Sequence, residues 1–279
     1  MNPIAREAPI GIFDSGLGGL TVLKEIRAQL PRESVVYLGD TARVPYGPKS
    51  PETVTRFALD AALFLLRKGV KLLVVACNTS SAMALETLRA TLRVPVIGVI
   101  EPGVRSALAG AQTGRIGVIG TVGTIASRVY QRGIRELLPD AQIHATACPL
   151  FVPLVEEGWI DHPVTRLVAE EYLCGMRESG VDALVLGCTH YPVLKGVIRE
   201  VMGANTRLID SAEEVAAEVG RVLADMNLAS PSRGPAETGF FATDVPERMA
   251  DQGERIWGTR IPKVSRVEVD ELAAPRTAR

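Results

Sequence analysis

A nine-residue segment that occurs twice constrains the fold of this chain more than any other feature of its sequence. Residues 69–77 (GVKLLVVAC) align without gaps with residues 180–188 (GVDALVLGC), and five of the nine positions are identical. Upstream of these segments, Ile10–Ser15 has a counterpart in Ile116–Thr121. A repeat of this kind predicts two copies of one structural unit, each about the size of a small domain.

Short runs of Val, Ile and Leu alternate with longer segments of helical period. Several runs are continuously apolar, as expected of strands buried on both faces. Helices with Pro at the start and Gly just past the end are expected at 51–69 and 163–180. Strands are expected at Ile10–Phe13, Val35–Leu38, Leu72–Ala76, Val96–Val99, Arg115–Ile119, Ile143–Ala145, Ala183–Gly187 and Arg207–Ile209. This alternation predicts an α/β fold of two pseudo-symmetric lobes, each a mainly parallel sheet flanked by helices, with the functional site in the cleft between them.

The repeat also predicts where the lobes begin and end. The first lobe is expected to comprise residues 1–99 and 211–258, because the helix that starts near 212 is expected to return to the first copy. The second lobe then spans residues 100–210. Residues 259–279 are expected to form a C-terminal extension, whose last residues, 273–279, fray.

Composition argues against several classes of function. The 279 residues include 31 basic and 32 acidic side chains, and this balance argues against nucleic acid or a membrane surface as the main partner. No apolar run approaches the roughly 20 residues that span a bilayer. Four cysteines are too few for a disulfide scaffold, and the start, MNPIAREAPIGIFDSG, shows no export signal. We therefore expect a reduced, cytoplasmic enzyme.

The two aligned cysteines, Cys77 and Cys188, each follow directly after a buried strand. Ligands bind at the carboxyl ends of strands in open parallel sheets, so both thiols are expected at the rim where sites form. Residues typical of helix starts come next, Asn78–Ser80 in one copy and Thr189–Pro192 in the other. A thiolate at a helix N-terminus is stabilised by the helix dipole and by free backbone N–H groups.

A free cysteine is most often a small buried hydrophobe, and we interpret Cys148 and Cys174 in that way. Packing alone does not predict that Cys77 and Cys188 recur at equivalent strand ends. Two lobes that face each other would place these thiols on opposite sides of one bound molecule. One thiolate could then remove a Cα proton while the opposite thiol delivers a proton to the other face, which inverts configuration without net redox change.

Several motifs resemble the glutamate racemase family, and the resemblance covers about residues 8–258 in the expected order. It is carried by Ile10–Gly19, Gly39–Gly47, Ala76–Thr79, Ile119–Thr124, Pro153–Gly158 and Gly187–Pro192. The resemblance implies a cofactor-independent enzyme that interconverts L- and D-glutamate and supplies D-glutamate for peptidoglycan. It also implies a homodimer that binds a small-molecule substrate.

The resemblance further implies roles for single residues. Cys77 would abstract the Cα proton of D-glutamate and Cys188 that of L-glutamate. Asp14, His190 and Glu156 would assist in catalysis. The substrate contacts would fall on Asp14, Ser15, Tyr46, Gly47, Asn78, Thr79, Thr121, Thr189 and His190. Hydroxyls, amides and backbone N–H groups of this kind suit the two carboxylates of glutamate. Asp14 could pair with the ammonium of glutamate or orient the Cys77 side, and His190 and Glu156 could be partners on the Cys188 side.

Purely structural interpretations of these residues are also open. Asp14 and Ser15 could only cap the helix that follows them. His190 could be a satisfied polar group at a helix start, and Glu156 could be a solvated helix end. Asp40, which ends a strand, could support the site from behind or merely shape a turn.

Cofactor chemistries fit the sequence less well. Gly16–Gly19 follows a strand, but the third glycine of a dinucleotide fingerprint would fall at Thr21. No Walker motif follows the glycines of 117–123, and none of the six lysines ends an expected strand as a Schiff-base lysine would. No CxxC or HExxH spacing indicates zinc. We therefore expect no cofactor and no metal.

Two alternative functions stay open. The chain could racemise aspartate or a related amino acid with the same two thiols. It could also be a two-lobed protein that binds an amino acid without turnover, although such a protein would not need a cysteine at both strand ends.

Overall fold

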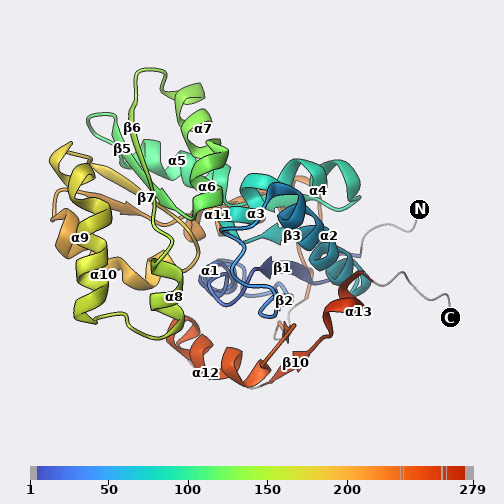
Figure 1. Ribbon diagram of the computed structural model, residues 1–279. Coiled ribbons are helices and arrows are strands. Elements are labelled where there is room, and N and C mark those ends of the chain that lie inside the picture. Colours follow the sequence, from blue (N-terminus) through green and yellow to red (C-terminus); the bar gives the residue numbers. More distant parts are fainter. Residues whose placement is uncertain (1–4, 233, 235, 259, 262, 274–279) are drawn as a thin grey trace.

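Two parallel β-sheets form the centre of the computed structural model, which describes residues 5–232, 234, 236–258, 260–261 and 263–273 (Figure 1). The first sheet has the order β10-β9-β2-β1-β3-β4 and the second has the order β6-β5-β7-β8. The first sheet contains β1 (Ile10–Asp14), β2 (Val35–Gly39), β3 (Leu72–Val75), β4 (Val96–Gly98), β9 (Thr238–Ala242) and β10 (Val264–Arg266). The second contains β5 (Arg115–Gly120), β6 (Gln142–Ala147), β7 (Ala183–Gly187) and β8 (Arg207–Ile209). The predicted α/β fold class is confirmed.

The predicted repeat is visible in the strand order and in the register. The run β2-β1-β3-β4 of the first sheet is matched by β6-β5-β7-β8 in the second. Ile10 pairs with Leu72 between β1 and β3, and the aligned residues Ile116 and Ala183 pair between β5 and β7. Because the register is the same, equivalent strands end at equivalent positions in the two sheets. The residues that follow β3 and β7 therefore occupy corresponding places at the carboxyl edges of the sheets.

Helices cover both sheets and their connections. They are α1 (Leu20–Gln29), α2 (Pro51–Arg67), α3 (Asn78–Met83), α4 (Leu85–Thr91), α5 (Ile100–Gly110), α6 (Val122–Ser127), α7 (Val129–Leu137), α8 (Phe151–Glu156), α9 (Pro163–Glu178), α10 (Lys195–Met202), α11 (Ala212–Asp225), α12 (Pro246–Trp257) and α13 (Val269–Ala273), with a 3-10 turn η1 at Tyr191–Leu194. In the described part of the chain, no helix is long and apolar enough to cross a membrane.

The two longest helices begin and end as their sequences predict. Ser50 caps α2 by accepting a hydrogen bond from the Thr53 N–H, and His162 caps α9 in the same way. Each helix has Pro in its first turn and is followed by a glycine with positive φ, Gly69 at 79° or Gly180 at 68°.

The interpretation of Cys174 as a buried residue is wrong, because this side chain is exposed on α9. The buried positions of this helix, Thr165, Ala169, Leu173 and Met176, follow the helical period. Cys174 lies one residue beyond Leu173 and so falls on the solvent face. Cys148, in contrast, is fully buried, as predicted.

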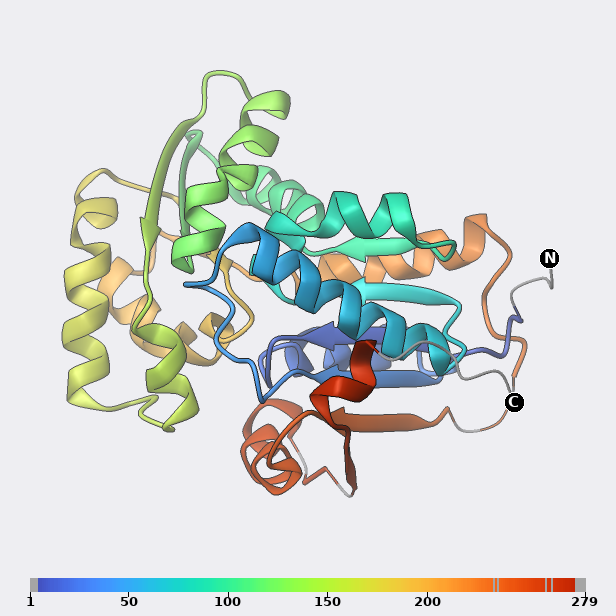
Figure 2. The same cartoon turned by 45° about the vertical axis from the view of Figure 1, so that its right-hand side comes forward.

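The C-terminal part of the chain returns to the first sheet, as the orange and red segments show in Figure 2. Helix α11 packs against α1, β9 pairs with β2, and β10 pairs with β9. Helix α13 packs on α2, where Arg67 donates a hydrogen bond to the Leu272 carbonyl over 2.9 Å. The sequence did not predict β9, β10, α12 or α13, which extend the first sheet beyond the repeat. Of the tail expected to fray, residues 274–279 lie outside the described residues.

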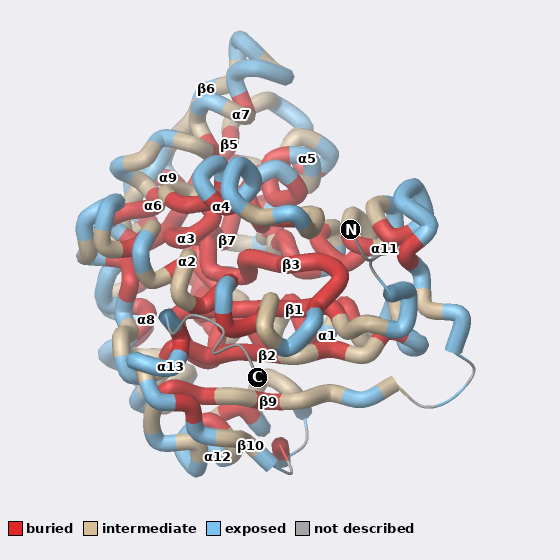
Figure 3. The backbone as a smooth tube through the Cα atoms, turned by 90° about the vertical axis from the view of Figure 1, so that its right-hand side faces the viewer, coloured by how far each residue is buried: buried red, intermediate tan, exposed pale blue. Residues whose placement is uncertain are grey.

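The central strands β1, β2 and β3 are buried, whereas the outer turns of the surrounding helices are exposed to solvent (Figure 3). Some charged side chains are nevertheless buried, and one of them is a lysine far from the ends of the strands where Asp14 and Asp40 lie. Lys71, at the amino end of β3, is fully buried and forms an ion pair with Glu33 over 2.5 Å. Its ammonium also donates hydrogen bonds to the carbonyls of Arg6 and Leu228, so it joins three distant segments.

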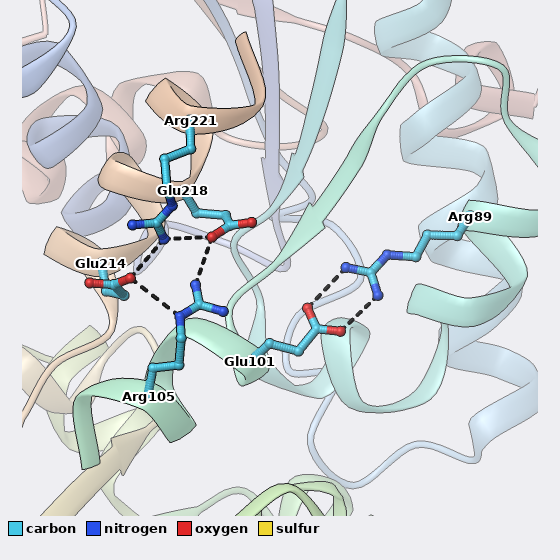
Figure 4. Close-up of polar contacts among 6 residues, drawn as sticks. All are labelled: Arg89, Glu101, Arg105, Glu214, Glu218 and Arg221. Atoms are coloured by element: carbon cyan, nitrogen blue, oxygen red, sulfur yellow. Dashed lines mark hydrogen bonds and ion pairs between the residues drawn. The ribbon is translucent and has the colours of Figure 1, made fainter. Parts of the chain in front are cut away.

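Exposed ion pairs link α5 to its neighbours on α4 and α11 (Figure 4). Arg89 and Glu101 form a bidentate pair with distances of 2.7 and 2.9 Å. Arg105 of α5 pairs with Glu214 and Glu218 of α11, and Arg221 pairs with the same two carboxylates. Because these groups are solvated, each pair contributes little to stability.

We expect Lys71→Met to lower the free energy of unfolding by about 3–5 kcal/mol, because Glu33 would remain buried without its partner. The matched change Arg89→Met, in an exposed pair, should cost less than about 1 kcal/mol. Urea unfolding of both variants and the parent checks the difference. Equal losses in the two variants would contradict this assignment.

Candidate active site

Most residues predicted to act lie at or just after four strand ends, two in each sheet; Tyr46 and Gly47 lie in the loop after β2, and Glu156 ends α8. Asp14 ends β1, and Cys77 is the N-cap of α3 just after β3. Thr121 is the N-cap of α6 after β5, and Cys188 follows β7. Ten of the twelve predicted site residues are among the buried side chains: Asp14, Ser15, Tyr46, Cys77, Asn78, Thr79, Thr121, Cys188, Thr189 and His190. Gly47 is also buried, and Glu156 is partly buried.

The Cys77 thiol lies beside a serine and close to a carboxylate. Its Sγ atom is 3.7 Å from the Ser15 Oγ atom, and only 4% of the residue is exposed. Burial and the nearby charge of Asp14 raise the pKa of Cys77 to about 11, although hydrogen bonds from Ser80 and Ser15 act in the opposite direction. Cys77 is therefore a thiol at neutral pH when the site holds no cation, and an ammonium group nearby would favour the thiolate.

The Cys188 thiol faces a histidine that is itself held by a carboxylate. The Cys188 Sγ atom is 3.9 Å from His190 Nδ1, and His190 Nε2 is 3.4 Å from Glu156 Oε1. Burial lowers the pKa of His190, but Cys188 and Glu156 raise it more, to about 10. Burial likewise raises the pKa of Glu156, but its interactions with His190 hold it below the usual range. These three side chains form a chain of charge-assisted contacts, so Glu156 is more than a solvated helix end.

Asp14 connects the two halves of the site. Its Oδ1 atom accepts a hydrogen bond from Thr189 Oγ1 over 3.3 Å, and its Oδ2 atom accepts one from the Gly16 N–H over 3.0 Å. Gly18 leaves room for this contact, because a Cβ atom there would lie 2.3 Å from Thr189 Oγ1 and 2.8 Å from His190 Nδ1. The ends of β1 and β7 therefore meet directly.

Hydrogen bonds also join α3 to the helices that follow β5. Thr79 and Thr121 share one between their hydroxyl groups over 2.9 Å. Asn78 accepts one from the Tyr130 hydroxyl over 2.7 Å. Tyr130 is fully buried and was not predicted, because nothing in the sequence around it indicates a contact 52 residues away.

The loop that carries Tyr46 and Gly47 is fixed by Asp40. This buried carboxylate accepts hydrogen bonds from the Tyr46 hydroxyl, from Arg43 over 2.6 Å and from Thr243 over 2.9 Å. Gly47 packs against Thr121, where a Cβ atom would lie 2.7 Å from the threonine Cβ. Asp40 thus supports the loop from behind. Arg43 and Thr243 were missed as contributors, the second because it follows the unpredicted strand β9.

Cys77 and Cys188 are 4% and 6% exposed, so the site is closed in this structure. The cavities next to it, which Glu156 lines, have volumes of only about 80 and 20 Å³. A cavity of about 520 Å³ lies elsewhere, between α4, α5 and α7, and neither cysteine lines it. A ligand can therefore reach both thiols only after some of the residues that cover them move. Among the described residues, no three His, Cys, Asp or Glu side chains gather as metal ligands would.

Comparisons with known proteins agree with this geometry. The model of the Asp/Glu/Hydantoin racemase family matches residues 10–219. The chain belongs to this family. A glutamate racemase from Geobacter metallireducens is 54% identical over 94% of this chain and 97% of its own length. The resemblance stated from the motifs is confirmed.

Two crystal structures of racemases are similar to this chain along nearly its whole length. A glutamate racemase from Bacillus anthracis has a TM-score of 0.90 at 40% identity and covers 94% of this chain and 98% of its own. The glutamate racemase from Francisella tularensis, solved in complex with D-glutamate, has a TM-score of 0.88 at 37% identity. That likeness covers 95% of this chain and 99% of the other.

For this racemase-family chain, we expect Asp14→Asn to lower the pKa of Cys77 from about 11, because the substitution removes a negative charge beside the thiol while keeping an acceptor for the Gly16 N–H. The rate of alkylation of Cys77 by iodoacetamide, followed against pH by peptide mass spectrometry, measures this value. Asp140→Asn, at an exposed position, serves as the control. A pKa that stays the same or rises would contradict the assignment.

Proposed function

We propose that this protein interconverts L- and D-glutamate by proton transfer at Cα between two thiols, Cys77 and Cys188, without a cofactor. The observation that carries the proposal is the equivalent placement of these thiols after β3 and β7, each with its own polar partner. The names of the similar racemases support glutamate as the substrate.

The reaction needs one thiolate and one thiol on opposite faces of the substrate. With D-glutamate bound, the Cys77 thiolate takes the Cα proton, and the electron pair is left on the Cα carbon. The Cys188 thiol then delivers a proton to the opposite face, which yields L-glutamate and leaves Cys188 as the thiolate. The reverse reaction exchanges the two roles, so no redox equivalent is gained or lost.

The partners of the thiols make both protonation states accessible. The ammonium of the substrate, placed near Asp14, would offset the charge that disfavours the Cys77 thiolate. A protonated His190, held by Glu156, stabilises negative charge on Cys188. The hydroxyl and amide groups of Ser15, Asn78, Thr79, Thr121 and Thr189, with the Tyr46–Gly47 loop, are the groups available to the two carboxylates.

Incubation with L-glutamate in D2O tests the proposal directly. After dialysis against a chelator and with no pyridoxal phosphate added, optical rotation should decay to zero while deuterium replaces the Cα proton. Absence of exchange from both L- and D-glutamate would overturn the proposal. Exchange with aspartate instead would identify a racemase of that acid.

Single cysteine variants separate catalysis from binding. Cys77→Ala and Cys188→Ala should each lower kcat by about 10²–10⁴-fold, since each removes one acid–base group. Both should still bind glutamate, as calorimetry would show. Parent rates in both variants would rule out the two-thiol mechanism, and binding without turnover by the parent would indicate an amino-acid-binding protein.

We further propose that the protein is cytoplasmic, supplies D-glutamate for peptidoglycan and acts as a homodimer. Its four unpaired cysteines suit a reducing compartment. Exposed apolar side chains at Trp159, Val164 and Leu167, around the start of α9, offer a surface for a second copy. Light scattering coupled to size-exclusion chromatography tests the dimer.

A further inference from the structure

Helix α12 of the C-terminal segment reaches across to α8, the helix that carries Glu156 (Figure 1). The Gln252 side chain donates a hydrogen bond from Nε2 to the backbone carbonyl of Glu156 over 3.0 Å. Arg248, one turn earlier, lies 3.8 Å from the carboxylate of Glu157. Two successive turns of α12 thus contact the end of α8.

The position of α12 is itself fixed against the first sheet's helices. Gly253 lies so close to its neighbours that a Cβ atom there would be 2.8 Å from Ile261 and 3.0 Å from Leu20 of α1. Gln252 is the residue just before Gly253, so its side chain projects from backbone that packs closely against α1. Helix α12 is therefore held in place by close packing against α1 where it contacts α8.

The orientation of the Gln252 amide is also determined. Arg248 Nε donates a hydrogen bond to Gln252 Oε1 over 3.2 Å, and because this contact requires an acceptor, the amide nitrogen must point the other way, toward Glu156. The carbonyl it meets is at the last residue of α8, where carbonyls have no partner within the helix. Gln252 supplies that missing partner.

The Glu156 side chain depends on this support. In the described part of the chain, the one ion-pair or hydrogen-bond partner of its carboxylate is His190, at 3.4 Å. Small cavities of about 80 and 20 Å³ lie beside it, and Gln252 lines both. Packing therefore leaves Glu156 room to move, and the backbone tether from α12 limits that movement.

We propose that Gln252 is a positioning residue for the reaction: it holds the last turn of α8 so that Glu156 faces His190, and through this pair it sets the proton transfer at Cys188. The inference rests on the proposed racemisation. It assigns to the C-terminal segment, which lies outside the repeat, a role in one half of the site only.

A substitution of Gln252 should therefore slow the proton transfer at Cys188 and leave the proton transfer at Cys77 unchanged. The equilibrium constant between the enantiomers is one, so kcat/KM must be equal in the two directions, whatever the variant. Primary isotope effects can still report which proton transfer limits the rate. A slower transfer at Cys188 raises the isotope effect for removal of deuterium from L-[2-²H]glutamate and lowers it for D-[2-²H]glutamate.

The test uses Gln252→Glu, which keeps the size of the side chain but removes the N–H donor. We expect kcat/KM to fall by up to about 10²-fold through misplacement of Glu156, with the isotope effect raised for the L-substrate and lowered for the D-substrate. Gln252→Met, which removes the amide without adding charge, should act in the same direction. Asp251→Asn, a neighbouring exposed position on α12, should behave as the parent.

Parent kinetics in both Gln252 variants would overturn the inference. So would a loss of rate in which the two isotope effects change equally, because a merely structural role does not distinguish the two thiols. Thermal unfolding of each variant shows whether it is folded. Failure of the parent to racemise glutamate would instead overturn the proposed function, so the two failures are distinguishable.

Discussion

The hydrogen bond from Thr189 to Asp14 joins the carboxyl ends of the central strands of two separate sheets, and the arrangement of the site depends on that junction. Each sheet alone places one thiol at its rim. The two thiols can act on the same carbon only when the rims face each other. Asp14 and Thr189 are both buried, so the contact is made in a region of low dielectric where an unpaired partner would be costly.

The scaffold is nearly symmetric, but its electrostatics are not. Equivalent strands in equivalent register deliver Cys77 and Cys188. A carboxylate, Asp14, lies near the first thiol, whereas a histidine backed by Glu156 lies near the second. A negative neighbour favours the protonated thiol and a positive neighbour favours the thiolate. The two thiols therefore lie in environments of opposite charge, and the proposed transfer between the two faces of the substrate needs such a difference.

The parts of this arrangement that are local or repeated could be predicted from the sequence. Every expected strand is present, and the aligned segments 69–77 and 180–188 have the same register against their neighbours. Strands and helix ends depend on an apolar pattern and a capping residue within a few neighbouring positions, so a single sequence is enough to predict them. The same holds for Cys77 and Cys188, which are adjacent to the strands that place them.

Contacts between distant segments could not be predicted in this way. Tyr130 reaches Asn78, and Thr243 reaches Asp40, through packing that no local pattern encodes. The short strands β9 and β10 have little periodicity of their own and are defined by the edge of the sheet they join. Cys174 was misplaced because its burial depends on which face α9 presents.

The C-terminal segment, which was not predicted, connects the first sheet to α8 of the second half of the site. It begins after α11 and adds β9 and β10 to the first sheet, and the helix between these strands, α12, contacts the end of α8. A closed site with both thiols nearly inaccessible must open to admit a ligand. The contacts of Arg248 and Gln252 join α12 to the end of α8, next to the closed site. Because one hydrogen bond in water-accessible surroundings is worth only about 1 kcal/mol, they can orient the closed state without preventing the opening.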